Sequence, residues 1–265
     1  MRLTIVWIIS IIFTLIIVVY QKTTGPTYPL KVIYEETKIK LPRSSSTDKE
    51  CKVVIPESNK FDNAYLLWKY YPGTYNYDTL QFILKDTVWE TVLPAQPSAG
   101  KLEYHIILCK NDQTVFDTKD QPAIIRFKDN VPAWALMPHI ILMFSSSLLS
   151  IVALFMIILK KGNYRLIAYL TLIALAAGGL IFGPIVQKFA FGQYWTGFPF
   201  GYDLTDNKTL IAFILWSIAV ALNIKKSRKW LIVLATIGTL VINSIPHSTR
   251  GSELNRETGK IETSK

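Results

Sequence analysis

The residues best suited to cofactor chemistry are two histidines that each directly follow a proline, His139 and His247. Two histidines on facing helices can ligate a haem iron, or can bind a divalent metal together with carboxylates. Asp203 and Asp206 are the nearest carboxylates in the predicted arrangement, and Met143, one helical turn below His139, is another side chain that a haem iron accepts. The sequence therefore suggests cofactor-binding residues His139 and His247, and a metal site that adds Asp203 and Asp206.

The same residues have an ordinary structural interpretation. Histidines at the membrane interface, belts of aromatic residues and aspartates that cap helices are common in membrane proteins. Residues 195–203 read Trp-Thr-Gly-Phe-Pro-Phe-Gly-Tyr-Asp, and Asp206 is a natural N-cap for the segment that follows. In this interpretation the polar residues cap helices and hold the aromatic loop. A site for a small ligand or a lipid headgroup at the same place is a third interpretation.

The elements that must position these residues are apolar. Between residues 131 and 245, long apolar stretches alternate with short polar breaks. The pattern predicts four membrane-spanning helices, over residues 133–159, 166–187, 207–224 and 230–245. Gly179 and Gly183 have a spacing that lets helices approach closely.

A further apolar run, Leu3–Tyr20, follows Arg2. A cleavable signal peptide has a similar charge and apolar core, but it ends in small residues at a cleavage site. Residues 17–22 lack such residues. We therefore interpret residues 1–21 as an uncleaved transmembrane signal anchor.

The basic residues predict how these helices are oriented. The loops 160–165 and 225–229 hold seven basic residues and no acidic one. Because positive loops stay in the cytoplasm, these loops and the N-terminus are predicted to be cytoplasmic. Residues 22–130 and the polar tail 248–265 are then extracytoplasmic, and the bundle 131–247 brings both histidines to its outer end.

Charge and motifs exclude several classes of function. The net charge is +10, but Arg2 and the seven loop residues account for eight positive charges, so nucleic-acid binding is not expected. No carboxylate or lysine lies in the middle of a predicted helix, which argues against an ion-coupled transporter. Phosphate-binding glycine loops, Cys-x-x-Cys pairs and zinc-protease motifs are absent from the sequence, as is a convincing nucleophile triad.

Residues 22–130 have a different pattern, in which short β-rich runs are separated by turn residues. The runs are 50–55, 64–70, 80–84, 88–93, 102–108 and 123–127. Many short strands at this spacing predict an all-β sandwich of immunoglobulin or fibronectin type. Part of residues 22–48, which include three consecutive serines, is interpreted as a linker.

Cys51, Trp68 and Cys109 occur in the order found in immunoglobulin domains, where the two cysteines bridge the sheets against the tryptophan. Cys109 has the opposite parity to the apolar residues of its strand, so a bridge requires a bulge or an edge position. A Cys51–Cys109 disulfide and two unpaired cysteines both stay open. His105 has the opposite parity to Tyr104 and is predicted to be a solvated strand residue.

Three segments, residues 127–139, 195–208 and 246–254, together resemble an uncharacterised family of bacterial membrane proteins. Such proteins combine an extracytoplasmic immunoglobulin-like domain with a C-terminal helical bundle. The resemblance implies a location in the bacterial cell envelope and implies no activity. Together with the predicted helices, it makes the bacterial inner membrane the expected location.

The expected fold class is therefore an α+β membrane protein with an N-terminal anchor, an extracytoplasmic β-sandwich and four further helices. The expected function is non-enzymatic binding or assembly in the envelope, with the lipid bilayer and a partner of the β-sandwich as contacts. The alternative is a redox protein that holds haem or a metal at the outer helix ends.

Overall fold

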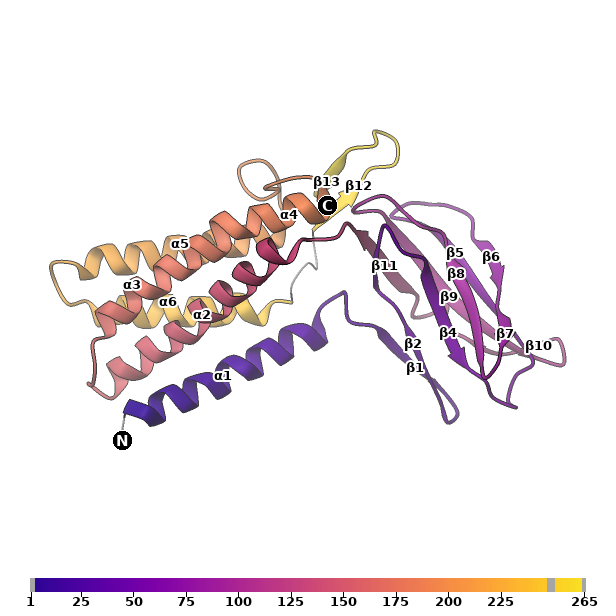
Figure 1. Cartoon of the computed structure of the whole chain (residues 1–265), viewed down its shortest axis with the longest axis horizontal. Helices are drawn as coiled ribbons and strands as arrows, with labels where there is room; N and C mark the ends of the chain where they lie inside the picture. Colours follow the sequence, from indigo (N-terminus) through magenta and orange to yellow (C-terminus); the bar gives the residue numbers. More distant parts are fainter. Residues whose placement is uncertain (1–2, 247–250, 264–265) are drawn as a thin grey trace. The chain divides into compact units, whose positions relative to one another are not determined.

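The computed structural model describes residues 3–246 and 251–263, and it is an α+β protein (Figure 1). The chain divides into two compact units. The helical unit contains Met1–Pro26, Val131–Ser252 and Thr263–Lys265, and the β unit contains Thr27–Asn130 and Glu253–Glu262. Part of the segment that follows the last helix, Glu253–Glu262, therefore belongs to the β unit.

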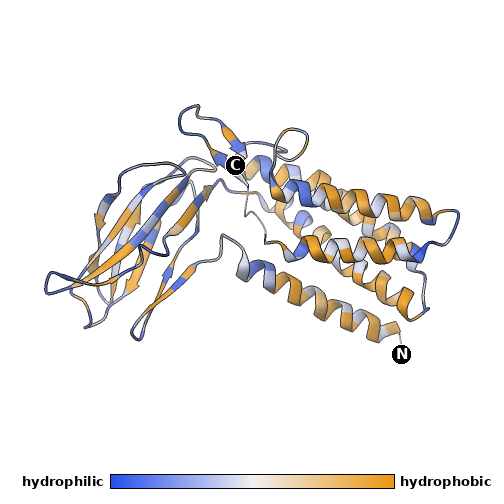
Figure 2. Cartoon of the chain, turned by 180° about the vertical axis from the view of Figure 1, so that it is seen from behind, coloured by the Kyte–Doolittle hydropathy of each residue, from blue (hydrophilic) through white to orange (hydrophobic). Residues whose placement is uncertain are grey.

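The helical unit consists of apolar helices, which Figure 2 shows largely in the colour of hydrophobic residues. They are α1 (Leu3–Thr24), α2 (Ala133–Ile158), α3 (Tyr164–Leu175), the π-helix η1 (Ala176–Phe182), α4 (Gly183–Phe191), α5 (Leu204–Asn223) and α6 (Lys229–Ser244). Among the described residues, four helices are long and apolar enough to cross a membrane: α1, α2, the continuous helix Tyr164–Phe191 and α5. The fifth predicted segment, α6, has 16 residues. It is about 24 Å long at 1.5 Å per residue.

Large apolar side chains cover the outside of these helices, whereas small polar side chains lie between them. The fully buried Trp216 of α5 donates its indole N–H to the Thr239 hydroxyl of α6 at 2.9 Å. Thr236 of α6 donates to the Ser150 carbonyl of α2 at 3.2 Å. An apolar exterior with hydroxyl groups between helices is compatible with a membrane protein.

Two glycines bring the helices close together at η1. A Cβ atom on Gly178 would lie 2.8 Å from the Cβ atom of Leu142 in α2. A Cβ atom on Gly179 would lie 2.5 Å from the Cγ2 atom of Thr209 in α5. Larger residues at these positions would push the helices apart. The close approach expected of Gly179 is present, whereas a Cβ atom on Gly183 would make only ordinary contacts, the nearest at 3.5 Å.

The β unit is built from short strands. They are β1 (Leu30–Tyr34), β2 (Thr37–Leu41), β3 (Ser44–Ser46), β4 (Cys51–Pro56), β5 (Asn63–Tyr71), β6 (Asp78–Gln81), β7 (Ile83–Lys85), β8 (Val88–Leu93), β9 (Lys101–Lys110), β10 (Gln113–Asp117), β11 (Ala123–Lys128), β12 (Ser252–Leu254) and β13 (Ile261–Thr263). The largest sheet has the order β3-β11-β9-β5-β6, and β10 pairs with the end of β9. A smaller sheet has the order β4-β8-β7, and the hairpins β1-β2 and β12-β13 form two-stranded sheets.

Alternate residues of the two larger sheets point into one hydrophobic core. Val53 and Ile55 of β4, Leu66 of β5, and Tyr104 and Ile106 of β9 are all fully buried in it. Since side chains alternate along a strand, the other residues of these strands face outward. The strands expected from the apolar runs are therefore present, although the run 80–84 divides into β6 and β7 of different sheets.

The segment interpreted partly as a linker is folded. Residues 30–41 form the β1-β2 hairpin, and β3 pairs in parallel with β11. Ile39 and Leu41 are fully buried in the core of the β unit. A linker within residues 22–48 is therefore limited to the residues outside these strands, and the serine-rich composition concealed the alternating apolar residues before it.

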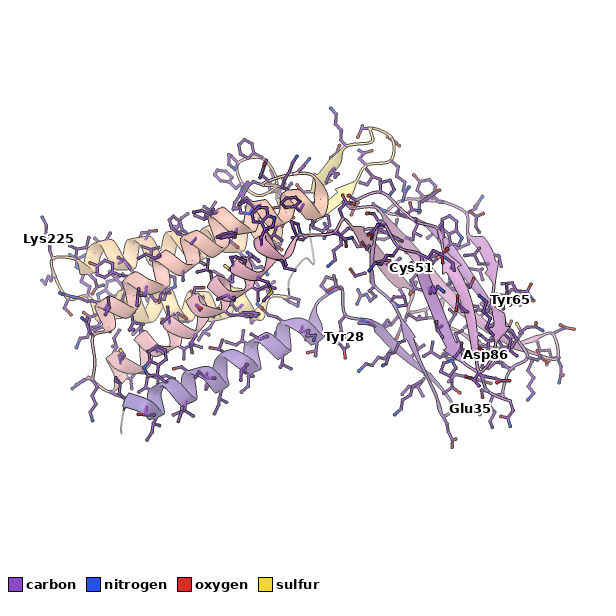
Figure 3. All side chains as sticks on the ribbon, viewed as in Figure 1. Tyr28, Glu35, Cys51, Tyr65, Asp86 and Lys225 are labelled. Carbon is purple, nitrogen blue, oxygen red and sulfur yellow. The ribbon has the colours of Figure 1, made fainter. Side chains whose placement is uncertain are left out.

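Cys51 and Cys109 are both unpaired. Cys51, which is labelled in Figure 3, is the first residue of β4. It lies opposite Leu93 of β8. Cys109 lies near the last residue of β9, where it pairs with Asn63. Tyr104 of β9 lies near Cys51. Cys109 has the opposite parity to Tyr104, so its side chain points away from the core in which Cys51 and Tyr104 are buried.

His105 is buried, so the prediction of a solvated histidine was wrong. Its side chain is 2% exposed and packs edge-on against Tyr77, with ring centroids 4.9 Å apart. Its Nε2 lies 3.8 Å from a carboxylate oxygen of Asp117. The parity prediction was correct in placing His105 on the opposite face from Tyr104, but other side chains cover that face.

Candidate functional site

His139 lies in the first half of α2 and is half-buried. Its Nδ1 is 2.8 Å from the carbonyl oxygen of Gly178. Because a carbonyl oxygen only accepts, Nδ1 carries the hydrogen and Nε2 keeps the lone pair. The same carbonyl accepts the N–H of Gly183, as the π-helix requires. His247, the other proposed ligand, lies outside the described residues.

Asp203, rather than Asp206, caps α5. One carboxylate oxygen of Asp203 accepts the backbone N–H of Thr205 at 2.8 Å and that of Asp206 at 3.4 Å. The helix therefore begins at Leu204, and the expected N-cap at Asp206 was wrong. A carboxylate one residue before the helix reaches the free N–H groups of the first turn, and Asp206 is already inside that turn.

Asp206 instead holds the preceding loop. It is 8% exposed, and its Oδ2 accepts the backbone N–H groups of Thr196 at 2.7 Å and Gly197 at 3.0 Å. Asn207 accepts the N–H of Phe198 at 2.7 Å. The bonds to Thr196 and Gly197 occupy one of the two carboxylate oxygens of Asp206. Among the described residues, no group of three or more His, Cys, Asp and Glu side chains is placed to hold a metal ion.

The loop held by Asp206 presents aromatic side chains. A Cβ atom on Gly197 would lie 2.6 Å from that of Asp206, so only glycine permits this close approach. The loop exposes most of four rings, Tyr194, Phe198, Phe200 and Tyr202. Of the three interpretations of these polar residues, the structure provides direct contacts for the one in which they cap a helix and hold the loop.

Lys208 connects the same end of α5 to the end of α6. It is 6% exposed, and its ammonium group donates to the carbonyl oxygens of Ile245 at 2.9 Å and Pro246 at 3.2 Å. These carbonyls lie at the C-terminus of α6, where a cation is electrostatically favourable. Lys208 therefore has a structural role that its position at a helix boundary did not reveal.

A second candidate site lies in the β unit, around Trp68. A pocket of about 460 Å³ is lined by Thr47, Asp48, Lys49, Glu50, Trp68, Leu80, Val92, Leu93, Pro94 and Ala95. Trp68 is 9% exposed, and its buried indole N–H has no hydrogen-bond partner within residues 3–246 and 251–263. A buried indole N–H usually has a partner, and leaving it unpaired costs about 1–3 kcal/mol.

The lining of this pocket combines apolar walls with a charged rim. Its walls come from β6, from the end of β8 and from the two residues that follow β8, while Asp48, Lys49 and Glu50 lie between β3 and β4. The sequence singled out Trp68 only as a possible partner of a disulfide. The pocket itself was missed, because its lining comes from segments that are separated in the sequence and meet only in the folded sheets.

No protein-family model, no curated protein and no solved structure matches this chain. Its function is therefore inferred from the placement of its own side chains.

Proposed function

We propose that this protein is a non-enzymatic, multi-pass protein of the bacterial inner membrane, whose extracytoplasmic domain binds a partner at the Trp68 pocket. The unpaired, buried indole N–H of Trp68, a residue that lines an apolar pocket, carries this proposal. It is a buried hydrogen-bond donor whose free-energy cost a bound acceptor would remove. The chemistry of the pocket suits recognition, since its lining contains neither a histidine nor a cysteine.

The strand order supports an immunoglobulin-like domain. The sheet β3-β11-β9-β5-β6, with β3 parallel to β11, packs over one core with the sheet β4-β8-β7. Immunoglobulin domains divide their strands between two sheets in this way and place a buried tryptophan on the third strand of the domain core. Trp68 on β5 occupies the corresponding position, and the domain lacks the disulfide.

The C-terminal tail supports an even number of membrane crossings after the β domain. Within the β unit, the Arg256 guanidinium lies 3.8 Å from the centre of the Tyr70 ring, and Glu253 forms an ion pair with Lys101. A tail that folds against the β domain must lie on the same side of the membrane as that domain. Residues 131–252 then cross the membrane an even number of times. Because α2, the helix Tyr164–Phe191 and α5 would make three crossings, we propose that α6 makes the fourth. The basic loops put the β domain outside.

The pocket favours an apolar group that carries a hydrogen-bond acceptor. Leu80, Val92 and Leu93 offer apolar contact, and the Trp68 indole offers one donor. Its volume matches the range of pockets that bind small ligands or a few side chains. An apolar side chain of an envelope protein, followed by a backbone carbonyl that accepts from Trp68, meets both requirements.

The proposal is tested with two ligands that differ in the acceptor alone. The full chain is labelled with fluorotryptophan, purified in detergent and titrated with 2-adamantanone or with 2-methyleneadamantane, which lacks the carbonyl oxygen. The ketone is expected to shift the Trp68 fluorine resonance at about a tenfold lower concentration than 2-methyleneadamantane does. This difference corresponds to about 1.4 kcal/mol for the added hydrogen bond.

Two substitutions serve as controls. Ala95→Trp fills the exposed mouth of the pocket and should abolish the shift, while Val115→Trp on β10 places the same ring on an exposed site outside it. Equal responses to the two ligands, or no saturable response of Trp68, would contradict the proposal. The indole N–H of Trp89 is also buried and lacks a hydrogen-bond partner among the described residues, so the Trp89 resonance reports any general effect on the domain.

A redox protein is retained as the second candidate, because the hydrogen bond from His139 to Gly178 leaves Nε2 with the lone pair that an iron or metal requires. Protein purified from cells with ample haem and iron would show a haem spectrum or stoichiometric metal, and His139→Ala would lose it. A colourless, metal-free protein would eliminate this candidate.

A further inference from the structure

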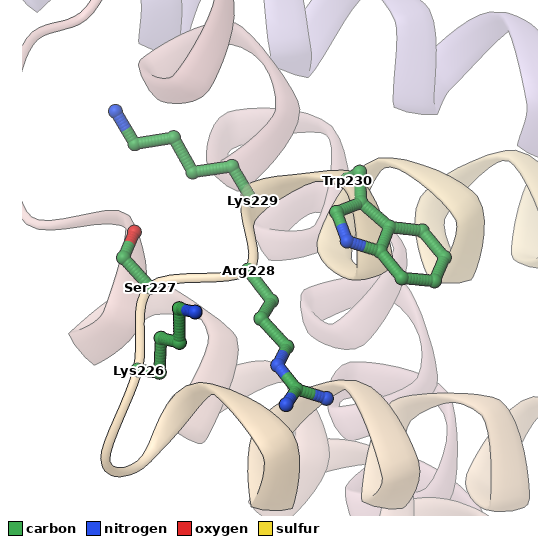
Figure 4. Close-up of a pocket in the computed structure, with 5 residues that line it drawn as sticks. All are labelled: Lys226, Ser227, Arg228, Lys229 and Trp230. Carbon is green, nitrogen blue, oxygen red and sulfur yellow. The ribbon is translucent and has the colours of Figure 1, made fainter.

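A pocket lined almost entirely by donors lies in the loop between α5 and α6 (Figure 4). Its lining is Lys226, Ser227, Arg228, Lys229 and Trp230, and its volume is about 460 Å³. Three of these five consecutive residues are cations and none is acidic. Positive charge at this place was expected from the orientation of the helices, but orientation alone does not require that the charges line a pocket.

The loop is held in a defined conformation by Asn223, which is only 4% exposed. Its Oδ1 accepts the backbone N–H of Arg228 at 2.8 Å, and its Nδ2 donates to the Arg228 carbonyl at 3.0 Å. Nδ2 also donates to the carbonyl of Ala219 in α5 at 2.8 Å. One buried amide therefore fixes both backbone groups of Arg228 against α5, and the cationic side chains start from a fixed backbone.

The second basic loop lies beside this pocket. The Tyr164 hydroxyl is 2.6 Å from the Ser227 hydroxyl, and the Lys229 ammonium lies 5.8 Å from the centre of the Tyr164 ring. Tyr164 belongs to the loop 160–165, which contributes three more cations. No acidic residue occurs in either loop, so their combined field is strongly positive.

The N-terminus of α6 adds to this positive field. A helix N-terminus carries a partial positive charge and free N–H groups, and it is usually capped by a Ser, Thr, Asp or Asn side chain. In α6 no side chain caps the first turn and no acidic residue lies in it, while Arg228 and Lys229 occupy the N-cap and first positions. Like charges are thus concentrated where the helix itself favours an anion.

We infer that the pocket at residues 226–230 binds the phosphate group of an anionic phospholipid in the cytoplasmic leaflet. The Lys226 and Arg228 side chains supply charge and Ser227 supplies a hydroxyl, whereas Lys229 extends away from Arg228 (Figure 4) and adds only to the positive field. Trp230 is 60% exposed and is of the residue type enriched at the membrane interface. Placement in that leaflet rests on the proposed topology; the anion site itself rests on the loop.

Native mass spectrometry of the full chain tests this inference. Detergent-solubilised protein is given equal amounts of phosphatidylglycerol and phosphatidylcholine, and the retained lipids are counted. Phosphatidylglycerol is expected to be retained preferentially, and the double variant Lys226→Gln/Arg228→Gln should reduce that preference by about fivefold or more. Lys160→Gln/Lys161→Gln removes the same charge from the neighbouring loop, outside the pocket lining, and should leave most of the preference.

Three outcomes would overturn the inference. Equal losses in the two double variants would show diffuse attraction without a site, and no loss in either would show that the pocket is not used. Saturable binding of inorganic phosphate that phosphatidylglycerol does not displace would assign the pocket to a free anion. If the topology alone is wrong, the lipid preference persists while a cysteine at position 227 is labelled from outside the membrane.

Discussion

His105 illustrates, at the scale of single residues, how a polar side chain can be predicted on the right face and still be buried. Alternation along β9 places it away from the core, yet Tyr77 and Asp117 cover it. Its Nδ1 has no hydrogen-bond partner among the described residues. Burial lowers the pKa of His105, and the smaller effect of the nearby Asp117 carboxylate opposes it.

This lowered pKa makes the stability of the β unit depend on pH. Below the ordinary histidine pKa of about 6.5 the unfolded chain binds a proton that the folded chain resists. The free energy of unfolding should therefore be constant above about pH 6.5 and should fall as the pH decreases toward the pKa of the folded state. Hydrogen exchange of the β9 amides between pH 7 and 5, corrected for intrinsic exchange rates, measures this pH dependence of the free energy of unfolding.

His105→Gln removes the titrating group and should flatten this pH dependence. His139→Gln is the matched control, since it removes a histidine from the helical unit and should leave the profile of β9 unchanged. Identical profiles for the wild type and His105→Gln would contradict the assignment.

At the scale of elements, the loop before α5 depends on one buried carboxylate. Asp203 caps the helix, while Asp206 accepts two loop N–H groups. The aromatic rings of the loop are exposed because the backbone between them is bound to α5. A residue expected to serve its own helix thus shapes the neighbouring element.

Asp206→Ala should release this loop. Two buried N–H groups lose their acceptor, so the variant should be destabilised by about 2–4 kcal/mol, whereas Asp206→Asn keeps one acceptor oxygen and should lose less. Hydrogen exchange or limited proteolysis of residues 192–203 measures the effect. Asp120→Ala, at an exposed site in the β unit, is the control, and a loop equally protected in Asp206→Ala would contradict this role.

At the scale of the whole molecule, the tail constrains the path of the chain. Asn130 and Glu253–Glu262 both belong to the β unit. The helical segment between them therefore begins and ends at the same domain. This arrangement supports the proposed membrane crossing by α6, although α6 is shorter than the usual thickness of the hydrocarbon core. Basic side chains at its start can extend to the interface and reduce the mismatch.

Cysteine labelling of spheroplasts tests the topology. Cys109 is partly exposed and should react with a membrane-impermeant maleimide without permeabilisation, whereas Cys51 should react slowly, since burial raises the pKa of its thiol. Ser227→Cys, in a background with Cys109→Ser, should react only after permeabilisation. Reversed accessibility of positions 109 and 227 would refute the proposed orientation.

Elements whose patterns are local could be predicted from the amino-acid sequence. Runs of apolar residues located the helices, alternation located β4, β5, β8, β9 and β11, and basic loops predicted an orientation. These patterns are readable because hydrophobic periodicity repeats within each element and needs no knowledge of its neighbours.

Tertiary structure alone decided which polar groups are satisfied, and therefore which are available for function. Asp206 and Lys208 are bound to backbone groups of other segments, and both cysteines are free. The unpaired Trp68 indole and the fixed loop at Arg228 likewise depend on contacts beyond their immediate neighbours in the sequence. A hydrogen bond requires both partners at about 3 Å, and for residues distant in sequence only the folded chain sets that distance.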